Sequence, residues 1–151
     1  MKVVRLCKRE YDTLDGIGAS KTGGRWTSPD LHVTYTASCG ALAILEYMAH
    51  LSTLPKNMIL LLIEIPDTLQ LEIGNWTPED PLAFRLIGDE WIKSASTVVL
   101  QVPSVLAPGQ KNYPINPKHQ LFGAIKIVSK TPFAFDSRLL SSIPPPVIAN
   151  P

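Results

Sequence analysis

The sequence lacks most of the features that mark secreted, membrane-spanning or metal-binding proteins. Its 151 residues include only two cysteines, Cys7 and Cys39, in separate segments without the C-x-x-C spacing or nearby histidine pair of a zinc site. The longest apolar run, residues 58–63, is far shorter than a membrane span, and no signal-peptide-like stretch follows Met1. We therefore expect a cytosolic protein with reduced, partly buried thiols, no metal site and no membrane contact.

An excess of charge of one sign is also absent. The chain has 14 basic and 13 acidic residues, spread without long like-charge runs, for a net charge of +1. Such a balance creates no field strong enough to gather nucleic acid, so direct nucleic-acid binding is not expected. No Gly-x-Gly-x-x-Gly follows a strand-like run, which argues against the nucleotide-binding motif of Rossmann dehydrogenases.

The composition that remains indicates one well-packed domain. The length suffices for one hydrophobic core but not for two ordinary domains. A hydrophobic fraction of 45%, with only 18% charged residues, argues against a disordered chain. The only low-complexity stretch is the end of the chain, where four prolines preclude a helix or central strand. We predict a domain at residues 1–141 and a proline-rich, flexible tail at 142–151.

The secondary-structure pattern predicts an α+β fold. Short β-like runs recur at residues 3–7, 32–36, 58–65, 97–102, 124–128 and 133–135. Helical patterns cover residues 38–50 and 81–94, and the segment 16–24, with four of the nine glycines, predicts a loop. Strands interrupted by isolated helices, without regular βαβ alternation, favour α+β over a doubly wound fold.

The two helical patterns imply which residues face the core. The first places four apolar residues on one face, offers Ser38 as N-cap and sets Glu46 one step off the apolar stripe; that face comprises Ala41, Ile44, Leu45 and Met48. The second places Leu82, Leu86 and Trp91 inward, although Gly88 lowers its helix propensity.

Three residues between positions 25 and 46 are candidates for chemistry. Arg25 follows a Gly-Gly pair, which lets the backbone approach a ligand while the guanidinium binds phosphate; alternatively, Arg25 is solvated or salt-bridged after a turn. Tyr35 is a site residue or a core aromatic with a satisfied hydroxyl. Glu46 lines a cleft or pairs with His50 on the surface. They follow one another as a loop arginine, a strand tyrosine and a helix glutamate, on elements short enough for the three side chains to meet at one site.

A second candidate cluster lies downstream. Ser104, Asn112, Asn116 and His119 bring hydroxyl, amide and imidazole groups onto turns whose angles are set by proline, as the wall of a ligand site requires. The alternative is that these segments are ordinary turns and that His119 caps one of them or is solvated.

These clusters also carry a resemblance to a known family, the RES-domain toxins of bacterial Xre-RES toxin–antitoxin pairs. Seven short motifs agree with that family in order and spacing from about residue 3 to residue 140. They are Val4-Arg5-Leu6, Gly24-Arg25-Trp26, Val33-Thr34-Tyr35-Thr36-Ala37, Ala43-Ile44-Leu45-Glu46, Val102-Pro103-Ser104, Asn116-Pro117-Lys118-His119 and Phe133-Ala134-Phe135-Asp136-Ser137-Arg138-Leu139.

The resemblance implies an ADP-ribosyltransferase-like fold, with an NAD⁺ cleft between two small, mostly antiparallel β-sheets and flanking helices. It implies an NAD⁺ glycohydrolase or phosphorylase that breaks the nicotinamide–ribose bond, so that NAD⁺ is substrate and not cofactor, with water or inorganic phosphate as acceptor. Arg25, Tyr35 and Glu46 match the active-site residues of the family. The nucleotide-cleft positions of the family correspond to Arg5, Ser104, Asn112, Asn116 and His119.

The resemblance also implies partners. A cognate Xre-like antitoxin is expected to block the NAD⁺ cleft, and the chain is expected to dimerise within that complex. Two other functions stay open at this point. A protein ADP-ribosyltransferase would use the same residues on a macromolecular acceptor, and a non-catalytic protein-interaction module would leave NAD⁺ intact.

Overall fold

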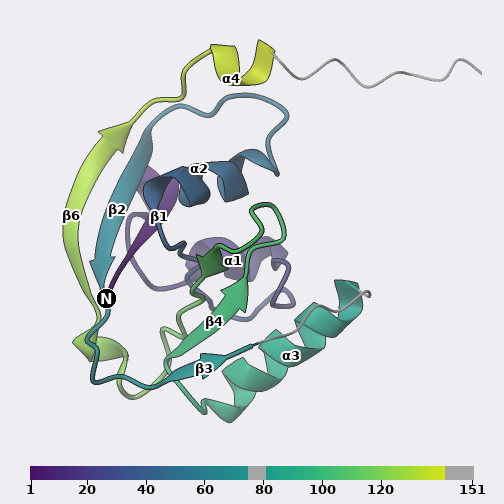
Figure 1. Cartoon of the computed structure of the whole chain (residues 1–151), viewed down its shortest axis with the longest axis vertical. Coiled ribbons are helices and arrows are strands. Elements are labelled where there is room, and N and C mark those ends of the chain that lie inside the picture. Colours follow the sequence, from purple (N-terminus) through teal and green to yellow (C-terminus); the bar gives the residue numbers. More distant parts are fainter. Residues whose placement is uncertain (75–80, 142–151) are drawn as a thin grey trace, which may run out of the picture.

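The structure, a computed structural model, describes residues 1–74 and 81–141. The segment 142–151, predicted to be a flexible tail, lies outside the described residues. The described part consists of two three-stranded sheets with helices packed beside them (Figure 1). The expected α+β fold with two small sheets is confirmed.

The first sheet has the order β1-β2-β6 and is antiparallel throughout, with β1 at Lys2–Lys8, β2 at Met58–Glu64 and β6 at Lys126–Phe133. The central strand β2 is covered on both faces, which explains its continuous apolar run. The predicted strands 124–128 and 133–135 overlap the two ends of one strand, β6, and residues 124–125 and 134–135 lie outside it. Pro132 does not end it, because an edge strand tolerates a residue without an N–H donor.

The second sheet pairs β3 (Leu71–Ile73) in parallel with β4 (Val99–Pro103), and β4 in antiparallel with β5 (Lys111–Asn112). The predicted strand 32–36 is not a regular strand. Its backbone instead forms isolated bridges in two directions, from Thr34 to Ile115 and from Ala37 to both Val4 and Asn112. This segment therefore ties the two sheets together and carries Tyr35 between them.

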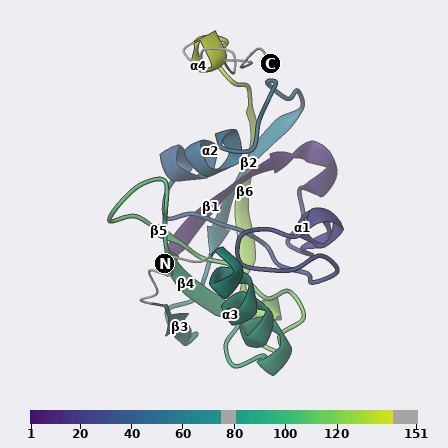
Figure 2. The ribbon, with the colours of Figure 1, turned by 90° about the vertical axis from the view of Figure 1, so that its right-hand side faces the viewer.

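Helix α2 (Gly40–Met48) packs on the first sheet through Leu42 and Ala43, the two buried residues of the helix (Figures 1 and 2). The predicted core face is therefore wrong for Ala41 and Leu45, which are exposed. Residues three and four positions apart share a helix face, so burial of Leu42 and Ala43 turns Glu46 inward. The predicted cap is also wrong: Cys39 occupies the N-cap position, and the Ser38 hydroxyl donates to Gln110.

Helix α3 (Pro81–Ser94) lies beside β4 and presents Phe84, Gly88 and Trp91 to the interior. Trp91 is buried as predicted, whereas Leu82 and Leu86 are 65% and 71% exposed, contrary to the prediction. The reason is the close approach at Gly88. A Cβ there would lie 1.6 Å from the Trp26 carbonyl oxygen, so only glycine allows this face of the helix to touch the Trp26 backbone.

Part of the predicted loop 16–24 forms a short helix, α1 (Ile17–Thr22). The Asp15 carboxylate accepts a hydrogen bond from the Ile17 backbone N–H. Gly16 and Gly23 flank the helix with φ of 72° and 71°, angles that glycine adopts without strain. The remaining helices are short: η1 (Arg9–Tyr11), η2 (Phe122–Ala124) and α4 (Arg138–Ser141).

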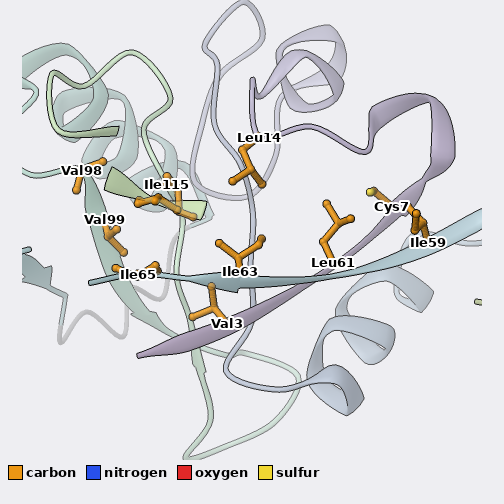
Figure 3. Close-up of a cluster of buried hydrophobic side chains, with 11 residues drawn as sticks. Val3, Cys7, Leu14, Ile59, Leu61, Ile63, Ile65, Val98, Val99 and Ile115 are labelled. Carbon is orange, nitrogen blue, oxygen red and sulfur yellow. The ribbon is translucent and has the colours of Figure 1, made fainter. Parts of the chain in front are cut away.

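The largest core cluster joins the two sheets. In Figure 3, Leu61 and Ile63 project from the same side of β2, the side on which Leu14 lies, and Val99 of β4 and Ile115 lie beyond Ile63, near Ile65. Separate clusters lie under α3, around Trp26 and Trp91, and under α2. These three clusters join the two sheets to each other, α2 to the first sheet, and α3 to β4 and Trp26.

Candidate functional site

A cavity of about 590 Å³ lies among β1, α1, the segment 23–26, α2 and the loop between β4 and β5. This volume is in the range of small-molecule sites. Five of the predicted site residues line it: Arg5, Arg25, Tyr35, Glu46 and Asn112. A second hollow, of about 670 Å³, lies at the end of β1 and contains none of the predicted site residues.

Glu46 is held at the cavity wall by two hydrogen bonds to the same carboxylate oxygen. Ser104 Oγ and Asn112 Nδ2 each donate to Glu46 Oε1 at 2.7 Å. The predicted alternative, a surface carboxylate paired with His50, is wrong: no ion pair in residues 1–74 and 81–141 involves Glu46, and its partners come from the β4–β5 region. With Oε1 occupied twice, Oε2 is the oxygen left for a ligand.

Ser104 and Asn112 thus contact Glu46 itself. Ser104 is buried and also accepts a hydrogen bond from the Ala107 backbone N–H, so its hydroxyl proton is committed to the carboxylate. Asn112 lines the cavity as well, at the end of β5. A hydroxyl and an amide that both donate to one oxygen fix the orientation of the carboxylate.

Tyr35 is fixed by a hydrogen bond and by close packing. Its hydroxyl lies 2.9 Å from Thr27 Oγ1, and a Cβ at Gly24 would come within 2.5 Å of the Tyr35 hydroxyl oxygen and 2.8 Å of its ring. Gly24 therefore allows the backbone to cross the tyrosine. Burial raises the pKa of Tyr35 and outweighs the opposing hydrogen bond from Thr27, so the phenol stays neutral at physiological pH.

Arg25 is exposed and lies at the cavity wall, with its guanidinium carbon 5.6 Å from the centroid of the Phe84 ring. That arrangement leaves the planar N–H groups free to bind an anion while the aromatic face supports the cation. Among the described residues, no carboxylate forms an ion pair with Arg25. The alternative in which a salt bridge holds Arg25 after a turn is therefore wrong as far as residues 1–74 and 81–141 are concerned.

Arg5 enters the cavity from β1, beside Cys7 and Tyr47. Its Nη1 is buried and has no hydrogen-bond partner in the described part of the chain. Burial raises the pKa of Cys7. The charge of Arg5 and its hydrogen bond lower this pKa, but by less than burial raises it. A buried guanidinium nitrogen without an acceptor is costly, so this atom marks a place where a ligand oxygen would be stabilised.

Asn116 and His119 are not brought to the cavity. Both are buried, and their polar atoms have protein partners: Asn116 Oδ1 accepts from the Lys118 backbone, Asn116 Nδ2 donates to the Ile92 carbonyl, and His119 Nδ1 accepts from the Leu121 backbone. Neither lies among the residues that line the cavity.

The sequence reading did not identify several residues of the cavity. Tyr47 and Cys7 form part of its wall, and Thr27 holds Tyr35 from behind. Cys7 is buried, whereas Cys39 is exposed, contrary to the prediction of a partly buried thiol for that residue. Tyr47 follows Glu46 directly, and Thr27 follows the Gly24-Arg25-Trp26 motif, but nothing in the sequence distinguishes either from an ordinary core residue.

No group of three or more histidine, cysteine, aspartate or glutamate side chains in residues 1–74 and 81–141 is arranged to hold a metal ion. Over the same residues, no helix is both long and apolar enough to cross a membrane.

Comparisons with known proteins show which sequences and which fold this chain is similar to. The chain is 36% identical over 144 residues to the Prs ADP-ribosylating toxin of Sphingobium sp. (strain YBL2), covering 87% of this chain and 89% of that protein. It is 35% identical over 151 residues to Toxin Res of Yersinia enterocolitica, covering 92% and 99%.

A solved structure has a similar fold. A chain of the M. tuberculosis MbcT–MbcA toxin–antitoxin complex superimposes with a TM-score of 0.68 at 15% identity, covering 88% of this chain and 84% of that chain. This likeness confirms the expected ADP-ribosyltransferase-like fold. The model of the RES domain family matches residues 2–136, nearly the whole described chain, and the protein therefore belongs to the RES domain family.

Proposed function

We propose that this protein is a toxin that consumes NAD⁺ by breaking the bond between nicotinamide and ribose. The observation that carries the proposal is the Glu46 carboxylate, which two donors hold at one oxygen, in a cavity whose other charged lining residues are Arg5, Lys8 and Arg25. Such a cavity offers positive charge for a pyrophosphate and one fixed negative group for a cation that forms during the reaction.

Binding of the pyrophosphate is assigned to Arg25 and Arg5. Arg25 presents a planar fork that matches two phosphate oxygens, which a lysine ammonium cannot do. Arg5 has a buried Nη1 that finds no acceptor in residues 1–74 and 81–141, and a phosphate oxygen would satisfy it. The two residues belong to different elements, β1 and the segment after α1. Both can therefore bind the same pyrophosphate.

The chemical step is assigned to Glu46. The bond between ribose C1′ and the pyridinium nitrogen breaks, its electron pair goes to the nitrogen, and neutral nicotinamide leaves without needing a proton. The ribose is left with oxocarbenium character, as in glycoside hydrolysis. Glu46 stabilises this cation through its charge and accepts a hydrogen bond from a ribose hydroxyl at Oε2. Water or inorganic phosphate then attacks C1′, and water releases its extra proton.

Tyr35 acts as a neutral aromatic wall. Its hydroxyl already bonds Thr27 and its pKa is raised by burial, which makes it a poor base. The ring can stack on nicotinamide or ribose and exclude water from the far side of the bond that breaks.

A second candidate is transfer of ADP-ribose to a protein. One relative, 36% identical, has the name Prs ADP-ribosylating toxin. The same Arg25, Tyr35 and Glu46 would serve both reactions, since only the acceptor that attacks C1′ differs.

An antitoxin partner follows from the same proposal. The structural neighbour is part of a toxin–antitoxin complex. In this chain Val105 and Leu106 are exposed apolar residues at the cavity wall, 52% and 40% accessible. Exposed apolar residues beside a ligand site are typical of a surface that a protein partner covers. We propose that a cognate Xre-like antitoxin binds here and closes the NAD⁺ cavity.

The test is to incubate the purified chain with NAD⁺, with and without inorganic phosphate, and to identify products by NMR or chromatography. Free nicotinamide with ADP-ribose indicates hydrolysis, and a phosphorylated ADP-ribose formed only with phosphate indicates phosphorolysis. NAD⁺ that stays intact alone, but is consumed when a protein acceptor becomes labelled, favours the transferase. NAD⁺ intact under all conditions would refute both enzymatic functions.

A further inference from the structure

One face of α3 contacts the segment that carries Arg25. Phe84, Arg85, Gly88 and Asp89 recur at the helical spacing of about four residues, and each contacts residues 24–28. Helix α3 comes from a different part of the chain and is packed in its own core cluster with Trp26 and Trp91. The segment is thus held against a rigid element.

The contacts act at both ends of the segment. At one end, the Asp89 carboxylate accepts two hydrogen bonds from Ser28: the backbone N–H donates to Oδ1 at 2.8 Å and the hydroxyl to Oδ2 at 2.6 Å. At the other end, Arg85 Nε donates to the Gly24 carbonyl oxygen at 3.2 Å. Between them, Gly88 lies directly against the Trp26 carbonyl.

Arg25 lies between these anchor points and has little else to position it. Its side chain is exposed, lies over Phe84 and has no ion-pair partner in residues 1–74 and 81–141. The direction in which its guanidinium enters the cavity is therefore set by the backbone of the segment. Of the hydrogen bonds between this backbone segment and α3, the contact between Ser28 and Asp89 has two points and a carboxylate acceptor, whereas Arg85 makes a single bond to Gly24.

We infer that Asp89 is a positioning residue for Arg25: it holds the segment 24–28 through Ser28, and so sets how well the cavity binds the pyrophosphate of its substrate. The inference rests on the proposed NAD⁺-consuming function. Asp89 itself contacts no substrate, because it is not among the residues that line the cavity.

The test compares substitutions on α3. Asp89→Leu keeps the branched shape of the side chain, with larger methyl groups in place of the oxygens, and removes both acceptors. Asp89→Asn keeps the acceptor for the Ser28 N–H and offers an amide to the Ser28 hydroxyl. Glu90→Ala is the matched control, since it removes a neighbouring, exposed carboxylate of the same helix. We expect Asp89→Leu to lower kcat/KM for NAD⁺ on the order of 10²-fold, mostly through KM, as a misplaced binding group does. Asp89→Asn and Glu90→Ala should stay near wild type.

The decisive readout is a double-mutant cycle with Arg25→Ala. If Asp89 acts through Arg25, Asp89→Leu causes little further loss in the Arg25→Ala background. A loss of equal size in both backgrounds, or a normal KM in folded Asp89→Leu, overturns the inference. Should Asp89→Leu fail to fold, Ser28→Ala replaces it in the same cycle, because it removes only the hydroxyl bond and should raise KM several-fold.

Amide hydrogen exchange separates this inference from the proposed function. Without any NAD⁺, exchange of residues 24–28 should be faster in Asp89→Leu than in wild type, with α2 unchanged. Unchanged protection of the segment overturns the inference even if the enzyme consumes NAD⁺. If the wild-type chain leaves NAD⁺ intact, the proposed function fails, while the exchange result still decides whether Asp89 holds the segment.

Discussion

Asn112 and Glu46 are 66 positions apart in the sequence, yet Asn112 Nδ2 donates to Glu46 Oε1 at 2.7 Å. Ser104 donates to the same oxygen. The acidic group of the cavity is therefore oriented by residues of the second sheet region and not by neighbours on its own helix.

The first prediction concerns these two donors. Asn112→Leu and Ser104→Ala should each lower NAD⁺ turnover by about 10-fold, because a freely rotating carboxylate is less well preorganised for the developing cation. In the Glu46→Gln background, the same substitutions should have almost no further effect on turnover, measured by nicotinamide release. If instead each donor substitution lowered turnover as much in Glu46→Gln as in wild type, the donors would act on the substrate and not through Glu46.

The second prediction is that Glu46→Gln keeps the fold and loses on the order of 10²-fold or more in NAD⁺ cleavage. The amide keeps the shape of the side chain but removes the charge that stabilises the ribose cation. Thermal melting checks the fold and single-turnover kinetics check the chemistry. Normal turnover by a folded Glu46→Gln variant would exclude Glu46 from the mechanism.

The third prediction separates binding from structure at Arg25. Arg25→Lys should be nearly as damaging as Arg25→Ala, with KM raised more than kcat is lowered, because one ammonium cannot replace the planar fork. Neither variant should lose much stability, since the side chain is exposed. If Arg25→Ala instead melted far below wild type and its activity followed the folded fraction, Arg25 would be a structural residue.

The fourth prediction follows from the raised pKa of Tyr35. Burial holds this pKa above the ordinary value of 10.0, so the folded state keeps the phenolic proton more tightly than the unfolded state. The associated stability is complete below about pH 10 and is lost as the pH rises through the folded-state pKa. Chemical denaturation over this range should show a steeper alkaline loss of unfolding free energy for wild type than for Tyr35→Phe. Equal slopes for the two proteins would contradict the assignment.

Tyr35→Phe also has an effect at neutral pH. It leaves the Thr27 hydroxyl without its phenolic partner, which should cost about 1 kcal/mol of stability. Thr27→Val serves as the matched control, because it removes the other half of the same contact. The alkaline loss of unfolding free energy should persist in Thr27→Val, which keeps the titrating phenol, and should disappear only in Tyr35→Phe.

The fifth prediction concerns cells that express the chain without an antitoxin. If NAD⁺ is the substrate, intracellular NAD⁺ should fall before growth stops, and the Glu46→Gln variant should affect neither. A time course of NAD⁺ content against culture density is the measurement. Growth arrest at constant NAD⁺ would reject NAD⁺ depletion and favour ADP-ribosylation of a protein target.

Several parts of the fold follow from local patterns in the sequence. The run 58–65 predicts β2, and the patterns at 38–50 and 81–94 predict α2 and α3 within two residues of their bounds, because hydrophobic periodicity and proline act locally. The order of Arg25, Tyr35 and Glu46, with the family resemblance, identifies three residues that line one cavity. Each of these depends on residues close together in the chain.

What the tertiary structure decided is the orientation of those elements and the partners of the site. Leu82 and Leu86 look like core residues in the sequence, but the close contact at Gly88 turns α3 so that they face outward. Asn116 and His119 look like site residues, yet their polar atoms have protein partners. The bonds from Ser104 and Asn112 to Glu46 depend on how two sheets pack, and no local pattern encodes contacts between residues so far apart in the sequence.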